Sequence, residues 1–271
     1  MTLVYVMCED DFNLGIVAVK SAVAYSSTRL RLIIIADKLN EKKMRKENTL
    51  PDVDAVLYAD TDVIFLHPIE DFWRMFYAMN EYQMAGMAPE TENLENNYYL
   101  KRKSVPPVRL NAGLMMMNLT RLRAFDLEDH ITRQLEEFEE RISFEDQDLL
   151  NILFAQYPQG LFTFSCRWNY RREHCLGGAL CADGPIAAIH ASRKVVHHKI
   201  EPAFVALHTV MANFKLGQNL VDDFIAPLRT SLRNTNLTGC TKELRKQLHL
   251  LRLAASRVDN KTAQAAAANE M

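Results

Sequence analysis

The amino-acid sequence predicts an α/β fold in which a parallel sheet carries helices on its faces. Residues 3–7 and 30–35 are short apolar runs typical of buried strands, and residues 14–26 between them place apolar side chains at helical spacing. This β-α-β alternation favours parallel strands, because the crossover helix returns the chain to the same edge of the sheet. Ligands of such sheets bind at the carboxyl ends of the strands, and the acidic residues Glu9 and Asp10 follow the first strand there.

A pair of carboxylates separates the next two predicted strands. Apolar runs at 53–58 and 63–66 flank Asp60 and Asp62, and the proline at position 68 is expected to end the second run. Residues at i and i+2 of an extended backbone point the same way, so both acids can reach one ligand. Two carboxylates at such a short distance repel each other unless a positive charge lies between them. The pair therefore indicates a divalent cation.

The remaining elements are predicted from apolar runs and helical periodicity. We expect helices within 38–52, at 71–80, 127–141 and 144–154, strands at 83–88, 110–118 and 186–189, and a polar loop at 89–108. Residues 1–240 are expected to form a single domain, followed by a packed helix at 241–258 and a flexible tail at 259–271.

Composition excludes several classes of partner. The chain has 271 residues, 48% of them hydrophobic, and a formal net charge of −2, which gives no electrostatic basis for binding nucleic acid or an anionic membrane. No apolar run approaches the ~18 residues needed to span a bilayer. The residues before the first strand also lack the basic segment and the cleavage site of a signal peptide. We therefore expect no nucleic-acid partner and no direct membrane contact from this chain.

Cysteine usage indicates an oxidising compartment. Cys166, Cys175 and Cys181 lie close together in a loop-like stretch, at spacings unlike the paired arrangement of zinc sites, so at least one disulfide is expected there. Glycosylation triplets begin at Asn118 and Asn236, and a further one at Asn260, which fits a lumenal protein.

Other polar residues stand where a ligand would approach. Asn111 and Gly113 open the strand at 110–118, where a small residue lets the backbone approach a ligand closely. Gln147 lies between Asp146 and Asp148 in the first turn of a predicted helix. Capping and the helix dipole account for both aspartates, but not for the glutamine.

Several motifs, taken together, resemble a known enzyme family. The segments YADTDVIFL, LNAGLMMMN, EDQDLLN and an apolar strand ending in His190 occur in the order typical of family 8 retaining glycosyltransferases. The segments LYADTDVIFLHPIEDFW, MAPE, DQDLLNILF, CRWNYRREHC and EPAF are similar to the glucoside xylosyltransferases of the secretory pathway. The resemblance covers residues 3–224 and is weaker beyond them.

The resemblance implies a glycosyltransferase A-type fold with a mixed, mostly parallel central sheet flanked by helices. The donor would bind in about residues 1–120 and the acceptor in about 121–240. The implied reaction transfers xylose from UDP-xylose to glucose O-linked to epidermal-growth-factor-like repeats, with retention of configuration. It also implies the lumen of the endoplasmic reticulum or Golgi, and an N-terminal signal anchor that this chain does not include.

By position in the motifs, the resemblance also assigns roles to single residues. It implies Mn²⁺ ligation by Asp60, Asp62 and His190, with Asp60 also contacting the donor. It places Cys8, Glu9 and Asp10 near the uridine, Asn111 and Gly113 near the donor sugar, and Gln147, Asp146 and Asp148 facing the reacting carbon.

The residue types fit that chemistry independently of the family. Two carboxylates and an imidazole suit Mn²⁺ and leave open positions for diphosphate oxygens. The amide oxygen of Gln147 is a poor nucleophile but can stabilise an oxocarbenium-like sugar, which favours attack by the acceptor on the same face. Trp168, Asn169 and Tyr170 offer a stacking and hydrogen-bonding surface for the acceptor sugar.

Departures from the family pattern leave other functions open. The connection at 38–52 is short, and Ala191 and Ser192 replace the family's Gly-Asn after His190. The alternatives are a binding protein that keeps the fold without turnover, a transferase using UDP-glucose or UDP-galactose, and an aspartyl phosphatase whose second acidic pair is Asp222 and Asp223.

Overall fold

The computed structural model describes residues 1–8, 11–36, 52–90, 110–142, 145–176, 181 and 183–269. Glu9 and Asp10, the connection at 38–51 and most of the expected loop at 89–108 lie outside these ranges. The predictions made for those residues stay predictions.

The N-terminal β-α-β unit is confirmed. Strand β1 (Thr2–Met7), helix α1 (Phe12–Ala24) and strand β2 (Arg31–Ala36) follow one another, and the two strands pair in parallel from Thr2 with Arg31 to Met7 with Ala36. Helix α1 buries its apolar side against the sheet, as its helical spacing predicts. This unit places the carboxyl end of β1 at the edge where a ligand is expected.

The central sheet is mixed and mostly parallel. Within the described residues it has six strands in the order β2-β1-β3-β6-β5-β7. Only β6 runs against the others, since it pairs antiparallel with both β3 and β5, whereas the other pairings are parallel. The added strands are β3 (Ala55–Ala59), β5 (Ala85–Pro89), β6 (Leu110–Asn118) and β7 (Leu161–Thr163).

A second, two-stranded sheet joins distant parts of the chain. Strand β4 (Val63–Phe65) pairs antiparallel with β8 (Ala188–His190), so that Val63 lies opposite His190. The backbone N–H of Ala191 extends this pairing by donating to the carbonyl of Asp62 over 3.0 Å. The register therefore fixes the end of β8 beside the start of β4.

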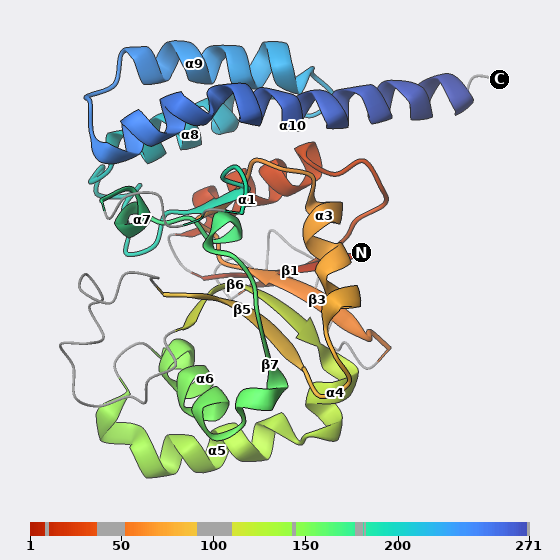
Figure 1. The fold of residues 1–271 in the computed structure, drawn as a ribbon, viewed down its shortest axis with the longest axis vertical. Helices are drawn as coiled ribbons and strands as arrows, with labels where there is room; N and C mark the ends of the chain where they lie inside the picture. Colours follow the sequence, from red (N-terminus) through yellow and green to blue (C-terminus); the bar gives the residue numbers. More distant parts are fainter. Residues whose placement is uncertain are drawn as a thin grey trace.

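Helices cover both faces of the central sheet (Figure 1). Helices α8, α9 and α10 form an outer layer on the side of α1, and α4, α5 and α6 lie on the opposite side. The sequence did not predict α4, α7, α8 or α9. The helices after α1 are α3 (Ile69–Trp73), α4 (Leu119–Ala124), α5 (Leu127–Phe138), α6 (Glu145–Gln156), α7 (Arg172–Leu176), α8 (Pro202–Asn213), α9 (Ala226–Arg233) and α10 (Gly239–Asn269), with short segments η2 (Arg74–Ala78), η5 (Glu139–Arg141), η6 (Pro158–Gly160), η7 (Cys166–Trp168) and η8 (Val221–Ile225).

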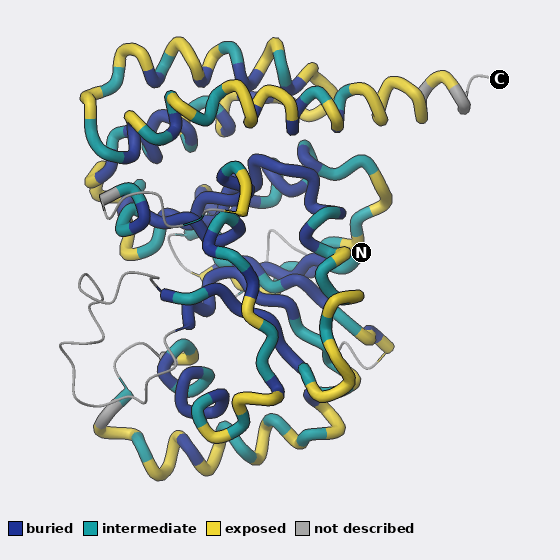
Figure 2. The backbone as a smooth tube through the Cα atoms, in the orientation of Figure 1, coloured by how far each residue is buried: buried dark blue, intermediate teal, exposed yellow. Residues whose placement is uncertain are grey.

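Burial follows this layering (Figure 2). The sheet and the inner faces of its helices are buried, whereas the outer faces of α5 and α10 are exposed. One apolar cluster lies between the sheet and α1, α8 and α10, and a second lies between the sheet and α5 and α6. Because both faces are covered, the carboxyl ends of the strands are left as the place where polar side chains can meet a ligand.

Helix α10 continues beyond its expected end. The sequence predicts a stop at Val258, but the helix extends to Asn269, so the expected flexible tail does not begin at residue 259. Alanine, the strongest helix former, dominates this extension. The carboxylate of Asp259 also accepts the backbone N–H groups of Leu220 and Val221, over 2.9 and 3.1 Å, which ties the extension to η8.

Two disulfide bonds cross-link the described part of the chain. Cys166 bonds to Cys181, which confirms the expected bridge in this stretch, and Cys175 bonds to Cys240 at the start of α10. The second bridge was not predicted, because Cys240 is distant in the sequence. Cys8 is exposed. Disulfides persist in oxidising compartments, and each typically stabilises a fold by about 2–4 kcal/mol.

Two buried histidines are expected to make stability depend on pH. Burial lowers the pKa of His67 to about 4 and that of His174 to about 3, from 6.5. The unfolded chain therefore binds protons more readily, and stability is lost as the pH falls below about 6.5. Each histidine is expected to lower the free energy of unfolding by up to ~1.4 kcal/mol per pH unit down to its folded pKa.

Urea unfolding at a series of pH values measures this dependence. A His174→Gln variant should have a shallower slope between neutral pH and the pKa of His67, because only one buried imidazole then resists protonation. An equal slope in the variant and the unaltered protein would contradict the expectation.

Candidate functional site

The two aspartates of the DTD segment lie where β3 turns into β4. Asp60 follows the last residue of β3, and its backbone N–H donates to the carbonyl of Gly113 over 2.8 Å. The hydroxyl of Tyr58 donates to Oδ1 of Asp60 over 2.8 Å. The sheet thus fixes both the backbone and one carboxylate oxygen of Asp60.

The structure brings Asp60, Asp62 and His190 together. Nε2 of His190 lies 3.3 Å from Oδ1 of Asp62 and 3.6 Å from Oδ2 of Asp60. One oxygen or nitrogen of each residue falls within 4.8 Å of the others. The imidazole is buried, Asp62 is mostly buried and Asp60 is half-buried. The β4–β8 pairing is what carries His190 to the aspartates.

The donor set fits a divalent cation. Oδ1 of Asp62 is buried and has no hydrogen-bond donor, although a buried polar atom normally has one. Partial burial and the nearby Asp62 raise the pKa of Asp60 to about 6, against the opposing effects of His190 and Tyr58. Burial would lower the pKa of His190, but the two aspartates raise it overall. All three groups therefore favour a positive charge between them.

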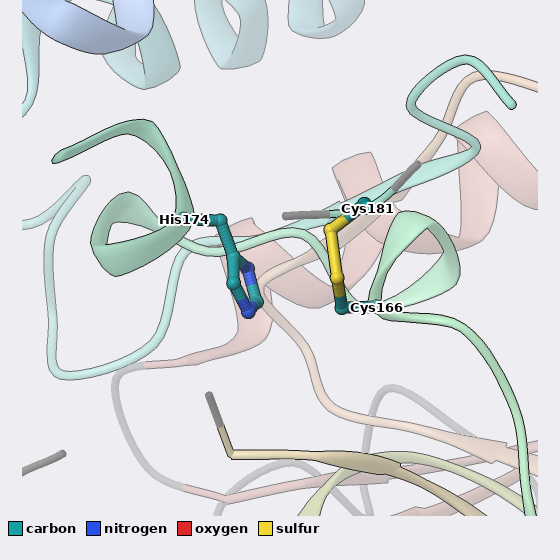
Figure 3. A group of neighbouring side chains, drawn as sticks. All are labelled: Cys166, His174 and Cys181. Atoms are coloured by element: carbon teal, nitrogen blue, oxygen red, sulfur yellow. A yellow bond between two sulfur atoms is a disulfide. The ribbon is translucent and has the colours of Figure 1, made fainter. Parts of the chain in front are cut away.

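A second grouping of possible ligands cannot hold a metal in this state. Cys166, His174 and Cys181 are neighbours, but both sulfurs are joined in the disulfide (Figure 3). A cysteine binds a metal ion as a thiolate, so the disulfide bond removes two of the three possible ligands. Among the described residues, the metal-type cluster that remains is Asp60, Asp62 and His190.

Asp60 and Asp62 line a cavity of about 680 Å³, and His190 is buried beside them outside the lining. The same cavity is lined by the cations of Arg193 and Lys194. Both basic residues have positive φ, 61° and 56°, in a tight turn after β8. The lining residues are Val6, Cys8, Asp11, Leu14, Tyr58, Asp60, Thr61, Asp62, Ala112, Gly113, Asp146, Gln147, Arg193, Lys194 and His197.

Sequence reasoning missed the basic side of this cavity. Arg193, Lys194 and His197 follow His190 in the loop after β8. Periodicity does not specify where such a loop folds back. Asp11, which lies 3.2 Å from Nε2 of His197, connects this loop to the start of α1.

The residues expected around the donor sugar divide into two groups. Gly113, Asp146 and Gln147 line the cavity, whereas Asn111 and Asp148 are buried and do not. The side chain of Asn111 is occupied: Nδ2 donates to Glu90 and Gln147, and Oδ1 accepts from Gly113 and Asn169. Because this is its full hydrogen-bonding capacity, Asn111 holds the site together and has no donor left for a sugar.

The orientation of Gln147 differs from the expected one. Its Oε1 accepts from Nδ2 of Asn111 over 2.9 Å and from the backbone N–H of Ala112 over 3.2 Å. A backbone N–H can only donate, so the assignment of this oxygen is firm. The amide oxygen is turned toward β6 and is engaged there by Asn111 and Ala112.

Trp168, Asn169 and Tyr170 do not form the expected surface for the acceptor sugar. All three side chains are buried, and Trp168 stacks on Phe72 with ring centroids 4.8 Å apart. A buried indole has no face to offer a sugar. An aromatic run has the same sequence pattern whether it packs in a core or binds a ligand.

Cys8 lies in the cavity lining, directly after β1. His190 contacts Asp62 and packs against Gly113. The structure thus gathers Asp60, Asp62, Cys8, Gly113, Asp146 and Gln147 at one cavity, whose lining does not include Trp168, Tyr170 or Asp148.

Gly113 is required because the imidazole lies against it. A Cβ atom at this position would overlap Cε1 of His190. We expect Gly113→Ala to displace the ring, lowering the free energy of unfolding by about 1–3 kcal/mol through overpacking and weakening metal binding roughly 10- to 100-fold. Urea unfolding and a titration with Mn²⁺ measure the two effects.

The control for this variant is Gly217→Ala. A Cβ atom at Gly217 would meet nothing within 4 Å, but the residue has φ of 91°, so alanine there adds backbone strain without touching the site. This variant is expected to lose stability and to keep its affinity for Mn²⁺. If Gly113→Ala also kept that affinity, the contact with His190 would not matter for the site.

The arrangement of sheet and site defines the class of protein. The fold matches that of the galactosyltransferase LgtC, solved with donor and acceptor sugar analogs, with a TM-score of 0.61 and 17% identity over 82% of this chain and all (100%) of that one. Apo mouse xyloside xylosyltransferase 1 matches with a TM-score of 0.50 and 14% identity over 72% of this chain and 99% of that one. The chain therefore has the glycosyltransferase A-type fold, as expected.

Sequence comparison then gives the family. Residues 43–198 match the family described as glycosyl transferase family 8, and the chain belongs to that family. Mouse glucoside xylosyltransferase 1 is 35% identical over 210 residues, which are 71% of this chain and 52% of the relative. The chain spans about half the length of the curated relatives it matches. The resemblance inferred from the motifs is confirmed.

Proposed function

We propose that this chain is a Mn²⁺-dependent, retaining glycosyltransferase that moves xylose from UDP-xylose to glucose O-linked on epidermal-growth-factor-like repeats. Support for the sugar comes from the similarity to glucoside xylosyltransferases. The observation that carries the proposal is one cavity lined by Asp60 and Asp62, which His190 contacts, together with the basic residues of the loop after β8. A site that combines acids with cations suits a metal-bound diphosphate.

The metal would be held by Asp60, Asp62 and His190. When bound, Mn²⁺ would act as a Lewis acid toward the diphosphate of the donor. The residues of the chain prepare that site: Tyr58 orients Asp60 through its hydroxyl, and Gly113 leaves room for the imidazole. In this proposal the carboxylates bind the cation as anions, so acid weakens binding by protonating them.

The loop after β8 would bind the diphosphate from the other side. Arg193 is held in place by Glu90 and Glu173, each 3.2 Å from its guanidinium. Lys194 and His197 line the same cavity. Cationic groups fixed before the reaction stabilise the charge that develops on the departing UDP. Asp146, which lines the cavity from α6, would face the sugar.

The sugar would be attacked on the face from which UDP departs, giving retention without a covalent intermediate. The orientation of Gln147 supports this choice, because its oxygen is engaged by Asn111 and Ala112 and is not positioned as a nucleophile. The acceptor hydroxyl would then lose its proton to a diphosphate oxygen of the leaving group. Each bond change balances: the acceptor oxygen gains the sugar, and UDP gains the proton.

Compartment and domain organisation belong to the same proposal. Two disulfides favour the lumen of the secretory pathway, where O-glycosylated repeats are made. None of the described helices is both long enough and apolar enough to cross a membrane. In the proposed organisation, residues 1–120 bind the donor and residues 121–240 bind the glycoprotein acceptor.

The test is a panel of UDP-sugars with an O-glucosylated repeat as acceptor. Mass spectrometry should show one added pentose with UDP-xylose and Mn²⁺, and no addition when a chelator removes the metal. Transfer of a hexose from UDP-glucose or UDP-galactose would replace the proposed donor. Binding of UDP and Mn²⁺ by thermal shift without any transfer would indicate the binding protein instead.

A further inference from the structure

A chain of buried side chains connects Glu90 to His190 through two asparagines. Asn111 donates from Nδ2 to Oε2 of Glu90 over 3.0 Å. Nδ2 of Asn169 lies 2.8 Å from Oδ1 of Asn111, and Oδ1 of Asn169 lies 2.8 Å from Nδ1 of His190. At most 5% of each of these four residues is exposed, so water does not compete for the hydrogen bonds.

The orientation of the first amide is fixed from outside the chain. The backbone N–H of Gly113 donates to Oδ1 of Asn111 over 3.1 Å, which identifies that atom as the oxygen. Nδ2 of Asn111 faces the carboxylate of Glu90, which accepts only. Burial would raise the pKa of Glu90, but Arg171, with Asn111 and Arg193, lowers it below its ordinary value, so this end of the chain stays anionic.

The direction of every further hydrogen bond follows. Since Oδ1 of Asn111 accepts, the group of Asn169 that faces it must be the donor Nδ2. Oδ1 of Asn169 is then the atom that faces the imidazole. An amide oxygen cannot donate, so Nδ1 of His190 must carry a hydrogen.

We propose that Asn169 is a positioning residue that keeps a hydrogen on Nδ1 of His190, and so leaves the lone pair of Nε2 directed at Asp60 and Asp62 for a divalent cation. The inference rests on the proposed metal site of the transferase. It also gives Asn169, which is buried within the CRWNY segment, a role that needs no contact with the acceptor: the asparagine acts from the core on a ligand.

The other side of the imidazole agrees with this assignment. Nε2 faces Oδ1 of Asp62 over 3.3 Å, and that oxygen is buried without a donor. A lone pair that faces two carboxylates is unfavourable unless a cation lies among them. The chain from Glu90 thus creates, at Nε2, a place that a metal ion fills.

Without Asn169, the alternative tautomer becomes the better one. A hydrogen on Nε2 would donate to Asp62, satisfying its buried oxygen, and would block the nitrogen that binds metal. Asn169→Ala is therefore expected to move the hydrogen from Nδ1 to Nε2. Mn²⁺ affinity should fall roughly 10- to 100-fold, as is typical when a group that orients a metal ligand is lost.

Long-range ¹H–¹⁵N spectra of ¹⁵N-histidine-labelled, metal-free protein at alkaline pH test the assignment. The His190 signals are identified by their absence from His190→Gln. In the unaltered protein, Nδ1 should give a protonated signal and Nε2 an unprotonated one. A hydrogen found on Nε2 in the unaltered protein overturns the proposal without need of any variant.

Two further variants separate positioning from general damage. Asn169→Asp keeps an acceptor oxygen toward Nδ1, and should retain the Nδ1 hydrogen that Asn169→Ala loses. Gln134→Ala removes a buried amide of α5 that contacts Gln156 and not the site, and should leave both the tautomer and Mn²⁺ affinity unchanged. Affinity is measured by electron paramagnetic resonance titration with Mn²⁺ alone.

The outcomes are distinguishable from those of the proposed function. If no UDP-sugar is transferred but the tautomer and Mn²⁺ affinity respond to Asn169→Ala as stated, the positioning role stands and the transferase proposal fails. If transfer from UDP-xylose occurs but Asn169→Ala keeps both the Nδ1 hydrogen and full Mn²⁺ affinity, the positioning role is overturned.

Discussion

Asp62→Asn is expected to reduce xylosyl transfer by roughly 10²- to 10⁴-fold, since a metal ion supplies several kcal/mol of charge stabilisation and each ~1.4 kcal/mol is tenfold in rate. The change removes a charge and keeps the shape. Nε2 of His190, which lies 3.3 Å from Oδ1 of Asp62, then faces an amide in place of a carboxylate. Initial rates with UDP-xylose, and a Mn²⁺ titration of the same protein, measure the loss.

The matched control is Asp222→Asn. Asp222 is exposed on η8 and borders a different cavity, with Arg229 and His249, so it should transfer xylose at the unaltered rate. It is also one of the acids that a phosphatase would need, and loss of a phosphatase activity in this variant would favour that function. An unaltered rate of transfer by the Asp62→Asn variant would contradict the proposal that Asp62 binds the metal ion.

Arg171→Met is expected to lower the free energy of unfolding by about 3–5 kcal/mol, the usual effect of removing one partner of a buried ion pair. Arg171 lies 2.5 Å from Oε2 of Glu90, and both side chains are almost completely buried. Methionine fills a similar volume, so the effect comes from a buried carboxylate that keeps only Arg193, whose side chain is 44% exposed, as a cationic partner. Urea unfolding at neutral pH measures it.

Two comparisons isolate the charge effect. Arg74→Met removes a surface pair with Asp71, in which the arginine side chain is 60% exposed, and should cost at most about 1 kcal/mol. The double variant Glu90→Gln/Arg171→Met should recover part of the stability that Arg171→Met loses, because no buried charge is left alone. Equal losses in the single and double variants would show that packing, and not charge, makes Arg171 important.

Much of the sheet was predictable because its strands are apolar runs bounded by polar turns. The strand at 110–118 has the same bounds in the structure as in the prediction, and β1, β3 and β4 differ from theirs by a few residues at most. Helices α8 and α9 were not predicted, although the EPAF segment leads into α8. Helix α9 has only eight residues, two of them arginines, which is too short for a clear apolar period. The extension of α10 was missed because an alanine-rich end is compatible with either a frayed tail or a helix.

The candidate site was predictable only where motifs fix it. Asp60 and Asp62 are two residues apart, so their joint orientation follows from the backbone. The role of Asn169 was not predictable, because it depends on three tertiary hydrogen bonds that no periodicity encodes. The same holds for Glu90 with Arg171, whose pairing joins β5 to the segment before α7. Sequence patterns specify local geometry, whereas such contacts depend on the assembled core.

The pairing of β4 with β8 would couple folding to binding of the proposed cation. In the unfolded chain, His190 is far from the aspartates, so a cation recognises only the assembled protein. Ligand that binds the native state alone at 100 times its dissociation constant adds about 2.7 kcal/mol to stability. A metal ion at this junction would therefore connect two distant stretches of chain and raise the free energy of unfolding as its concentration rises.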